Sequence, residues 1–268
     1  MIPLDMLIPF VFLWEQTRPS YHHRRAFHNR TEYHNRRNQL HNSEGPAVEW
    51  TNGRNEWYQN GTRHRIGGPA IEWPNHGQSY WMNGRLHRTD GPAIEWADGF
   101  RAWYVDGKRH RADGPAITNY LTGPTAWYQN GQLHRADGPA EEWPDGCKKW
   151  YQNGQLHRAD GPAVIETVPG DCVKWYLNGQ LHRTDGPAVE FLPIGDTEYW
   201  IDGRPHRTGE PAKILVVDGA FWRYEYHTNG RLHRTDGPAI VNPDGTTEYW
   251  VEGEQLPPQE FENLYGII

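Results

Sequence analysis

The chain has 268 residues, a net charge of −7 and a mean hydropathy of −0.92, and only 36% of its residues are hydrophobic. It nevertheless contains 14 Trp and 14 Tyr, so large aromatic side chains must supply much of the apolar contact. This composition argues against intrinsic disorder, which is typical of aromatic-poor chains. Residues 18–37 carry a charge of +5 and the remainder −12. The acidic remainder disfavours nucleic-acid binding along its length, whereas the basic segment could contact an acidic partner.

The first residues form the one strongly aliphatic run of the chain, residues 1–14. This run lacks the basic start and the cleavage site of a signal peptide. It is also too short, and too interrupted by Pro3, Asp5 and Pro9, to span a bilayer. We expect it to cap the end of a repeat array, with insertion into a membrane or a partner as the alternative. Residues 1–37 are therefore predicted to form an apolar cap and a basic arm.

Residues 38–256 are a tandem repeat. Each unit is a variant of Asn/Asp-Gly-x-x-His-Arg-x-Asp-Gly-Pro-Ala, and its first glycine recurs at intervals of 23 to 27 residues. A fixed period of this size indicates an array in which each unit packs mainly on its neighbours. Pro257 and Pro258 should end the array, and residues 257–268 are expected to form a C-terminal cap.

Two strands can be predicted in each unit. A run such as Ile94-Glu95-Trp96 alternates apolar and polar residues, as a half-buried strand does. A turn such as Asp98-Gly99 follows, which is a strong hairpin signal. The second strand carries an aromatic pair such as Trp103-Tyr104, with one ring on each face. The Asn/Asp-Gly pair is then expected to open a loop that returns through His-Arg-x-Asp to Gly-Pro-Ala.

The predicted fold class is all-β: an elongated, twisted antiparallel array of β-hairpins, a single-sheet meander of about nine units. No segment shows helical periodicity of useful length. The alternative is closure into a β-propeller, because two units would make a four-stranded blade of about 46 residues. Nine units would leave half a blade over, so the open array is preferred.

The segment from Trp103 to His110 resembles the WxNGKxH core of MORN repeats, and the period of 23 matches theirs. Asp145-Gly146 matches the second turn of that family, and the resemblance covers residues 38–256. The Arg-x-Asp-Gly-Pro-Ala continuation departs from the usual MORN pattern. This variant resembles arrays found in bacteriophages and giant viruses and is similar to MORN variants known as bacterial antitoxins. The resemblance implies a non-enzymatic scaffold that binds proteins, and a phage-encoded inhibitor of a host defence protein would fit it.

Cys147 and Cys172 occupy equivalent positions in adjacent repeats. If each repeat adds two strands, equivalent Cα atoms lie roughly 9.6 Å apart, whereas a disulfide needs less than about 7 Å. Both are therefore predicted to be free thiols in a reducing compartment, such as the cytoplasm, or the host cytoplasm if the protein is phage-encoded.

The histidine that recurs in each unit does not predict a metal site. Zinc needs ligand nitrogens about 2.0–2.1 Å away, whereas equivalent residues recur at roughly 9.6 Å. We interpret His-Arg-x-Asp as a structural ladder in which each Arg contacts the Asp two residues on, or its counterpart in the next unit. The ladder residues are His87, Arg88, Asp90, His110, Arg111, Asp113, His134, Arg135, Asp137, His157, Arg158, Asp160, His182, Arg183, Asp185, His233, Arg234 and Asp236. The sequence contains no catalytic or cofactor-binding motif, so a non-enzymatic protein without cofactor or metal is predicted.

The aromatic residues are the best candidates for binding. A single-layer sheet cannot bury both of its faces, and exposed aromatic rings are enriched in protein interfaces. The residues around the turn between the two strands also differ from unit to unit, and a partner could use them to find one register. The candidate residues are His76, Trp81, Phe100, Trp103, Tyr104, Trp127, Tyr128, Trp150, Tyr151, Trp175 and Tyr176. The alternatives are that these rings only pack the sheet in an architectural scaffold, or that they bind a small ligand such as a nucleotide signal or a glycan.

Overall fold

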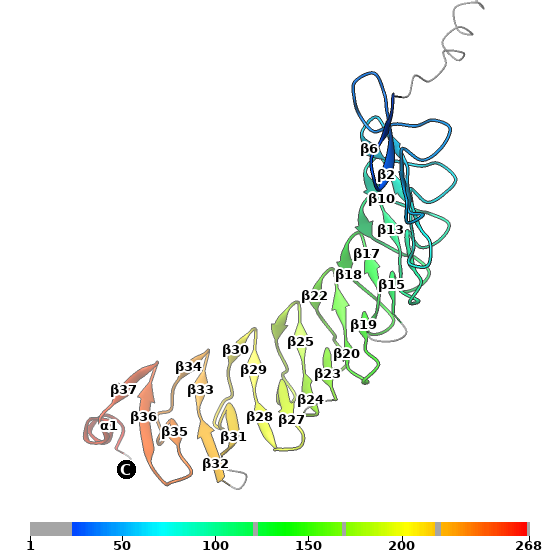
Figure 1. The fold of residues 1–268 in the computed structure, drawn as a ribbon. Helices are drawn as coiled ribbons and strands as arrows, with labels where there is room; N and C mark the ends of the chain where they lie inside the picture. The colour runs from blue at the N-terminus through cyan, green and yellow to red at the C-terminus, as the bar shows by residue number, and fades with distance from the viewer. Residues whose placement is uncertain (1–22, 120–122, 168–169, 218–220, 267–268) are drawn as a thin grey trace, which may run out of the picture. The chain divides into compact units, whose positions relative to one another are not determined.

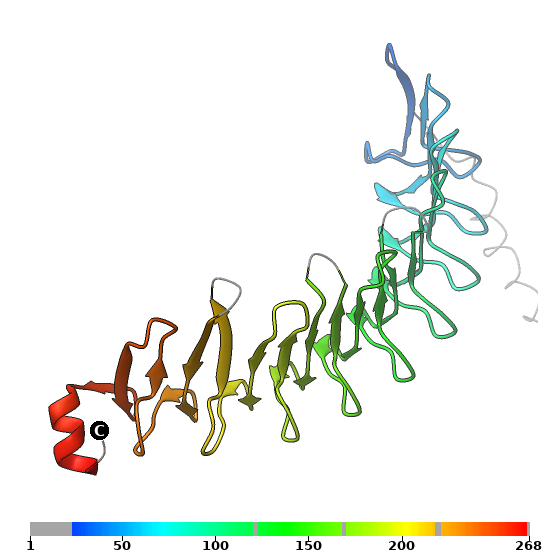
Figure 2. The same cartoon turned by 90° about the horizontal axis from the view of Figure 1, so that it is seen from below.

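The computed structural model describes residues 23–119, 123–167, 170–217 and 221–266. The chain divides into two compact parts, Met1–Arg109 and His110–Ile268, and both are built from the same repeating unit (Figures 1 and 2). The apolar run of residues 1–14 and the start of the basic arm lie outside the described residues.

Each part contains an antiparallel sheet in which strands pair in chain order. In the first part these strands are β1 (His23–Ala26), β2 (Arg30–His34), β3 (Val48–Trp50), β4 (Asn55–Glu56), β7 (Ile71–Trp73), β8 (Gly77–Ser79), β11 (Ile94–Trp96) and β12 (Arg101–Ala102). In the second part they are β15 (Ile117–Thr118), β16 (Thr125–Ala126), β19 (Glu141–Glu142), β20 (Lys148–Lys149), β23 (Val164–Glu166), β24 (Cys172–Lys174), β27 (Val189–Phe191), β28 (Asp196–Glu198), β31 (Lys213–Val217), β32 (Phe221–Glu225), β35 (Ile240–Val241), β36 (Thr247–Val251) and β37 (Glu254–Leu256). The predicted all-β hairpin meander is thus confirmed. Within each part the described sheet strands pair from one unit to the next, as in β16–β19 and β20–β23, and do not form the separate four-stranded blades of a propeller.

Each unit also forms a second, smaller hairpin where the sequence suggested only a loop. In the first part these hairpins are β5 (Tyr58–Gln59) with β6 (Thr62–Arg63), β9 (Trp81–Met82) with β10 (Arg85–Leu86), and β13 (Tyr104–Val105) with β14 (Lys108–Arg109). In the second part they are β17 (Tyr128–Gln129) with β18 (Gln132–Leu133), β21 (Tyr151–Gln152) with β22 (Gln155–Leu156), β25 (Tyr176–Leu177) with β26 (Gln180–Leu181), β29 (Trp200–Ile201) with β30 (Arg204–Pro205), and β33 (His227–Thr228) with β34 (Arg231–Leu232). In Figure 1 the small hairpins of the second part, such as β29–β30 and β33–β34, follow one edge, and sheet strands such as β28 and β32 follow the other.

The Asn-Gly pair makes the small hairpin. Asn60 and Gly61 have φ angles of 49° and 79°, as a type I′ turn requires at both of its central positions. Asparagine and glycine are the residues that adopt these angles most readily. Later units repeat the turn with Asn or Asp, and with Glu252 in the last. In each unit with a small hairpin, the sheet strand ends just before the first aromatic residue of the pair, and the first strand of the small hairpin begins just after it.

The core of each unit is narrow. The alanine of every Gly-Pro-Ala is fully buried, at 0% exposure. In the middle of the second part, for example, the Trp127 N–H donates to the Ala140 carbonyl at 2.8 Å, and the Ala140 N–H donates to the Lys149 carbonyl at 2.8 Å. A larger side chain would have to enter between two backbones that are hydrogen-bonded through this residue. This explains why the same small residue occurs in every unit.

The recurring histidine of each unit, which includes His41, His64 and His206 of the altered units, contacts the hairpin turn of the next unit. At every such junction within the described residues, the backbone N–H of the first turn residue donates to the histidine Nδ1, at 3.1 to 3.2 Å. The pairs are Asn60–His41, Asn83–His64, Asp106–His87, Asn130–His110, Asn153–His134, Asn178–His157, Asp202–His182, Asn229–His206 and Glu252–His233. At several of these junctions the same Nδ1 also lies close to the side-chain oxygen of the turn residue, at 2.9 Å in His87–Asp106 and 3.1 Å in His134–Asn153. The histidines therefore join neighbouring repeats.

The C-terminal end of the second part is covered by α1 (Pro258–Tyr265). Its one buried residue, Phe261, has 0% exposure. The Phe261 ring lies 4.6 Å from that of Tyr249 on β36 and 4.9 Å from that of Tyr265. Pro at the start of the helix and Gly266 in the left-handed conformation after it fix the two ends.

The two cysteines are unpaired with each other. Cys172 is buried and Cys147 half-buried, and both are free thiols, as the spacing predicts. The Cys147 Sγ lies 3.6 Å from the Thr167 Oγ1. Burial raises the pKa of the Cys172 thiol, which makes it a weaker nucleophile at neutral pH.

Glu225 should make the second part sensitive to acid. A hydrogen bond to His227 Nε2 at 3.1 Å lowers the pKa of Glu225, burial opposes this, and Arg223 Nε at 2.8 Å lowers it further, to about 2. Because the folded-state pKa is depressed, the carboxylate stabilises the fold above about pH 4.5, and this contribution is lost as the pH falls towards 2. The melting temperature of E225Q should be below that of the wild type at pH 7, and the two should converge by about pH 2. Parallel curves over this range would contradict the assignment.

Candidate functional site

The His-Arg-x-Asp loops form the ladder predicted from the sequence. Each arginine Nε donates to the aspartate two residues on, at 2.7 to 2.9 Å; the pairs are Arg88–Asp90, Arg111–Asp113, Arg135–Asp137, Arg158–Asp160, Arg183–Asp185 and Arg234–Asp236. The same arginines donate through NH1 to the carbonyl of the proline four residues on. Hydrogen bonds from arginine hold the pKa of each of these aspartates below its usual range. In each of these six pairs the aspartate belongs to the same loop as its arginine.

The ladder arginines also cover the first aromatic ring of each pair. The arginine Cζ lies 3.7 to 4.2 Å from the ring centre, which is cation–π geometry. The pairs are Arg65–Trp57, Arg88–Tyr80, Arg135–Trp127, Arg158–Trp150, Arg183–Trp175, Arg207–Tyr199 and Arg234–Tyr226. Three of the rings proposed for binding, Trp127, Trp150 and Trp175, are thus half-buried beneath arginines of their own units.

The second aromatic residue of each pair begins a small hairpin and lies on the other side of the strand. The Trp81 Nε1 donates to the buried Ser79 hydroxyl at 2.8 Å, and the Tyr104 hydroxyl accepts from Arg109 Nε at 3.0 Å. The equivalent residues Tyr128, Tyr151 and Tyr176 are half-buried on β17, β21 and β25. Trp103 and Phe100 are half-buried as well.

A third row of aromatic rings follows the turns of the first part, at the ends of β3, β7 and β11. It contains Trp50, Trp73 and Trp96. The gap between Trp50 and Trp73 is filled by Arg54, whose Cζ lies 6.0 Å and 5.4 Å from the two ring centres. We call this row, with the side chains that fill its gaps, the turn row.

The preceding gap of the turn row is filled in the same way. Arg30 Cζ lies 4.5 Å from the Phe27 ring centre and 5.1 Å from that of Trp50. Arg30 Nε also pairs with Glu32 at 2.6 Å, as Arg54 NH2 pairs with the buried Glu56 at 3.0 Å. Each of these two gaps therefore holds a planar cation together with the carboxylate two residues further along the chain.

The gap between Trp73 and Trp96 is different because Gly77 occupies the position of Arg54. Gly77 has φ +135°, and a Cβ built on it would lie 2.2 Å from the Glu95 carbonyl oxygen and 2.6 Å from the Trp96 ring. No side chain can stand there without a shift of the Trp96 strand. Two residues after Gly77, Ser79 occupies the position that Glu56 occupies in the preceding repeat. This gap thus lacks both the cation and the carboxylate.

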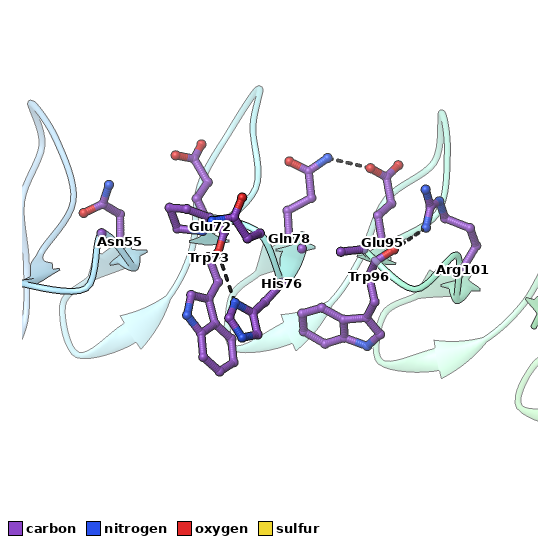
Figure 3. Close-up of a pocket in the computed structure, with 13 residues that line it drawn as sticks. Asn55, Glu72, Trp73, His76, Gln78, Glu95, Trp96 and Arg101 are labelled. Atoms are coloured by element: carbon purple, nitrogen blue, oxygen red, sulfur yellow. Dashed lines mark hydrogen bonds between the residues drawn. The ribbon is translucent and has the colours of Figure 1, made fainter.

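An open groove of about 440 Å³ marks this gap. Its walls include Trp73, His76 and Trp96, whose rings lie on one side of the strands (Figure 3). The carboxylates of Glu72 and Glu95 lie on the other side. They are paired there with Arg65 and Arg88, the latter at 2.9 Å. The volume is within the range of ordinary ligand pockets.

His76 forms one wall of the groove. Its ring is stacked on Trp73, with ring centres 4.0 Å apart and planes at 10°. Its Nδ1–H donates to the Pro74 carbonyl at 3.0 Å, which fixes the ring orientation. The side chain is otherwise exposed, so the second face of the imidazole is available to a bound group.

The sequence indicates His76 as a binding residue but does not indicate a groove. Of the eleven proposed binding residues, only His76 lines it. The alternation in runs such as Ile94-Glu95-Trp96 places the Trp on the apolar face of a half-buried strand, which does not indicate a groove. The signal that could have found the groove is the substitution of glycine at one turn position in a row of otherwise larger residues.

No family model matches this chain, and no curated protein matches it in sequence. Within the described ranges, no group of three His, Cys, Asp or Glu side chains is placed to hold a metal ion. No helix among the same residues is long and apolar enough to cross a membrane.

Proposed function

We propose that this protein is a non-enzymatic repeat array that binds a protein partner through the turn row of its first part. The observation that carries the proposal is the groove between Trp73 and Trp96, an opening in a row whose two preceding gaps are filled by the chain itself. Aromatic residues in pockets are the usual energetic centres of protein interfaces. A non-repeating feature such as this groove would also let a partner find one register on a repetitive surface.

The polar side chains of the His-Arg-x-Asp loops have structural partners. The ladder arginines and aspartates bind each other, and the histidines hold the turns of neighbouring repeats. The hydrogen-bonding atoms of these side chains are already occupied by contacts within the array. A partner would gain little from replacing them, which favours the groove as its binding site.

The test compares three forms of the full chain as bait in lysate of the source cells. We expect the wild type to retain a protein in stoichiometric amount and H76A/W96L to lose it. The control is W143A, which removes the equivalent Trp of a second-part repeat, 37% exposed, and should retain it. Retention by all three baits would show that the groove is not the binding site. Retention of no protein by the wild type would contradict the binding function.

A further inference from the structure

The chemistry of the turn row indicates what the groove would bind. In this chain an arginine at the position of Arg54 is accompanied by a glutamate two residues on. Arg30 pairs with Glu32 and Arg54 with Glu56 in the first part, and Arg223 pairs with Glu225 at 2.8 Å in the second. The carboxylate compensates the half-buried guanidinium, whose charge is costly to remove from water.

The open gap has no such carboxylate. Ser79 occupies the position of Glu56 and is buried at 3% exposure, and its hydroxyl is already bonded to Trp81. On the neighbouring hairpin strand, Leu86 occupies the position of Arg63, which pairs with Glu56 at 3.2 Å. Arg101 also lines the groove, and its NH1 donates to the Trp96 carbonyl at 2.7 Å. The gap therefore has no carboxylate on the side where the rings lie.

We infer that the groove between His76 and Trp96 receives a neutral aromatic side chain of the partner, Trp, Tyr or Phe, and rejects arginine. This inference rests on the proposed function and specifies its anchor. A neutral ring would stack on the exposed face of His76 and on Trp96 and would bury apolar area without a charge to compensate. An arginine would meet two rings but no carboxylate, since those of Glu72 and Glu95 lie on the other side and are paired with Arg65 and Arg88 (Figure 3).

The inference can be tested on the isolated full chain with small probes. The probes are N-acetyl-tyrosinamide and N-acetyl-argininamide, and the readout is the NMR signals of the Trp indole N–H groups, assigned by Trp→Phe variants. N-acetyl-tyrosinamide should shift the Trp73 and Trp96 signals with a millimolar dissociation constant. N-acetyl-argininamide should bind at least 10-fold more weakly, and the Trp143 signal should not move with either.

A matched variant fills the gap with the same side chains that fill the gap of the preceding repeat. The turn of the preceding repeat, residues 51–54, has the same length as residues 74–77 and shares its asparagine. The graft P74T/H76G/G77R/S79E should therefore place an arginine and its glutamate between Trp73 and Trp96, with a shift of the Trp96 strand that makes room for the new Cβ at position 77. It should abolish the shift by N-acetyl-tyrosinamide. If this variant fails to fold, the converse graft T51P/G53H/R54G/E56S should open a second gap and make the Trp50 signal respond.

The outcomes separate the inference from the proposed function. Stronger binding of the arginine probe, or no shift with the tyrosine probe up to its solubility limit, overturns the aromatic anchor even if the bait retains a partner. An unchanged response in a folded graft overturns it as well. If the tyrosine probe binds as expected but no bait retains a protein, the anchor site stands and the protein-binding function is contradicted.

Discussion

Replacing Phe261 by alanine should release α1 from the end of the second part. Phe261 is fully buried at 0% exposure, between Tyr249 and Tyr265, and removing a buried phenylalanine side chain costs about 3–5 kcal/mol. A helix of eight residues is not stable alone in water. The loss should therefore appear as undocking of the helix, with fraying of β36 and β37, because a repeat array depends on the contacts between neighbours.

Hydrogen exchange by mass spectrometry measures this undocking. In F261A, peptides covering residues 247–265 should lose most of their protection, and peptides from the first part should not change. The control is L264A on the same helix, where the side chain is 61% exposed and little effect is expected. Equal protection in F261A and the wild type would show that α1 does not cover the array end in solution.

The sequence predicted the sheet hairpins well because their signals are local. Alternating residues such as Ile94-Glu95-Trp96 and the glycine of the following turn determine β11 and its pairing with β12. The small hairpins were missed although Asn60-Gly61 is the strongest signal in the unit. Asn52-Gly53 resembles it in sequence, but only Gly53 has positive φ there, so the two turns differ in type. The sequence therefore predicts a hairpin at the first turn, Asn52-Gly53, and only a loop at the second, Asn60-Gly61.

The groove could not be predicted because it depends on three successive repeats. Its presence follows from a missing side chain at Gly77 and from the close approach of the Trp96 strand in the next hairpin. The pattern within one unit gives the face on which Trp73 and Trp96 lie, but not what fills the space between them. The unusual turn of Asn75-His76-Gly77 was visible in the sequence, and His76 was proposed from it. The missing carboxylate of the gap can be recognised only from the strand register, which aligns Ser79 with Glu56.

The cation–π ladder shows a similar limit. The contact of each ladder arginine with the aspartate two residues on was expected and is present. The stacking of Arg135 on Trp127 was not, since the two residues are eight positions apart in an apparent loop. The small hairpin β17–β18 reverses the chain between them and brings the guanidinium to 4.0 Å from the ring centre. Because the sequence did not indicate the turn of the small hairpin, the contact between the ladder arginine and the aromatic ring could not be predicted.

The R135A variant should weaken its repeat by roughly 2 kcal/mol while leaving the groove intact, since it removes a cation–π contact and hydrogen bonds of a charged group. Arg135 contacts the Trp127 ring, Asp137 at 2.9 Å, the Pro139 carbonyl at 3.2 Å and Glu142 at 3.2 Å. Its backbone N–H donates to the Tyr151 carbonyl at 3.2 Å, so the exchange rate of that amide reports the junction. R135K keeps the charge without the planar fork and should lose about half as much.

Three further measurements decide between a structural and a binding role for this ladder. In R135A the pKa of Asp137, which Arg135 holds below its usual range, should rise towards that of a free aspartate. The smaller change D137A should affect stability less, because this side chain is 85% exposed and surface ion pairs contribute little. In R135A/D137A the melting temperature should fall, while the affinity of the groove for N-acetyl-tyrosinamide at low temperature stays unchanged, since the groove is built from first-part residues alone. A double variant that keeps full amide protection but loses the partner would place binding on the loops instead.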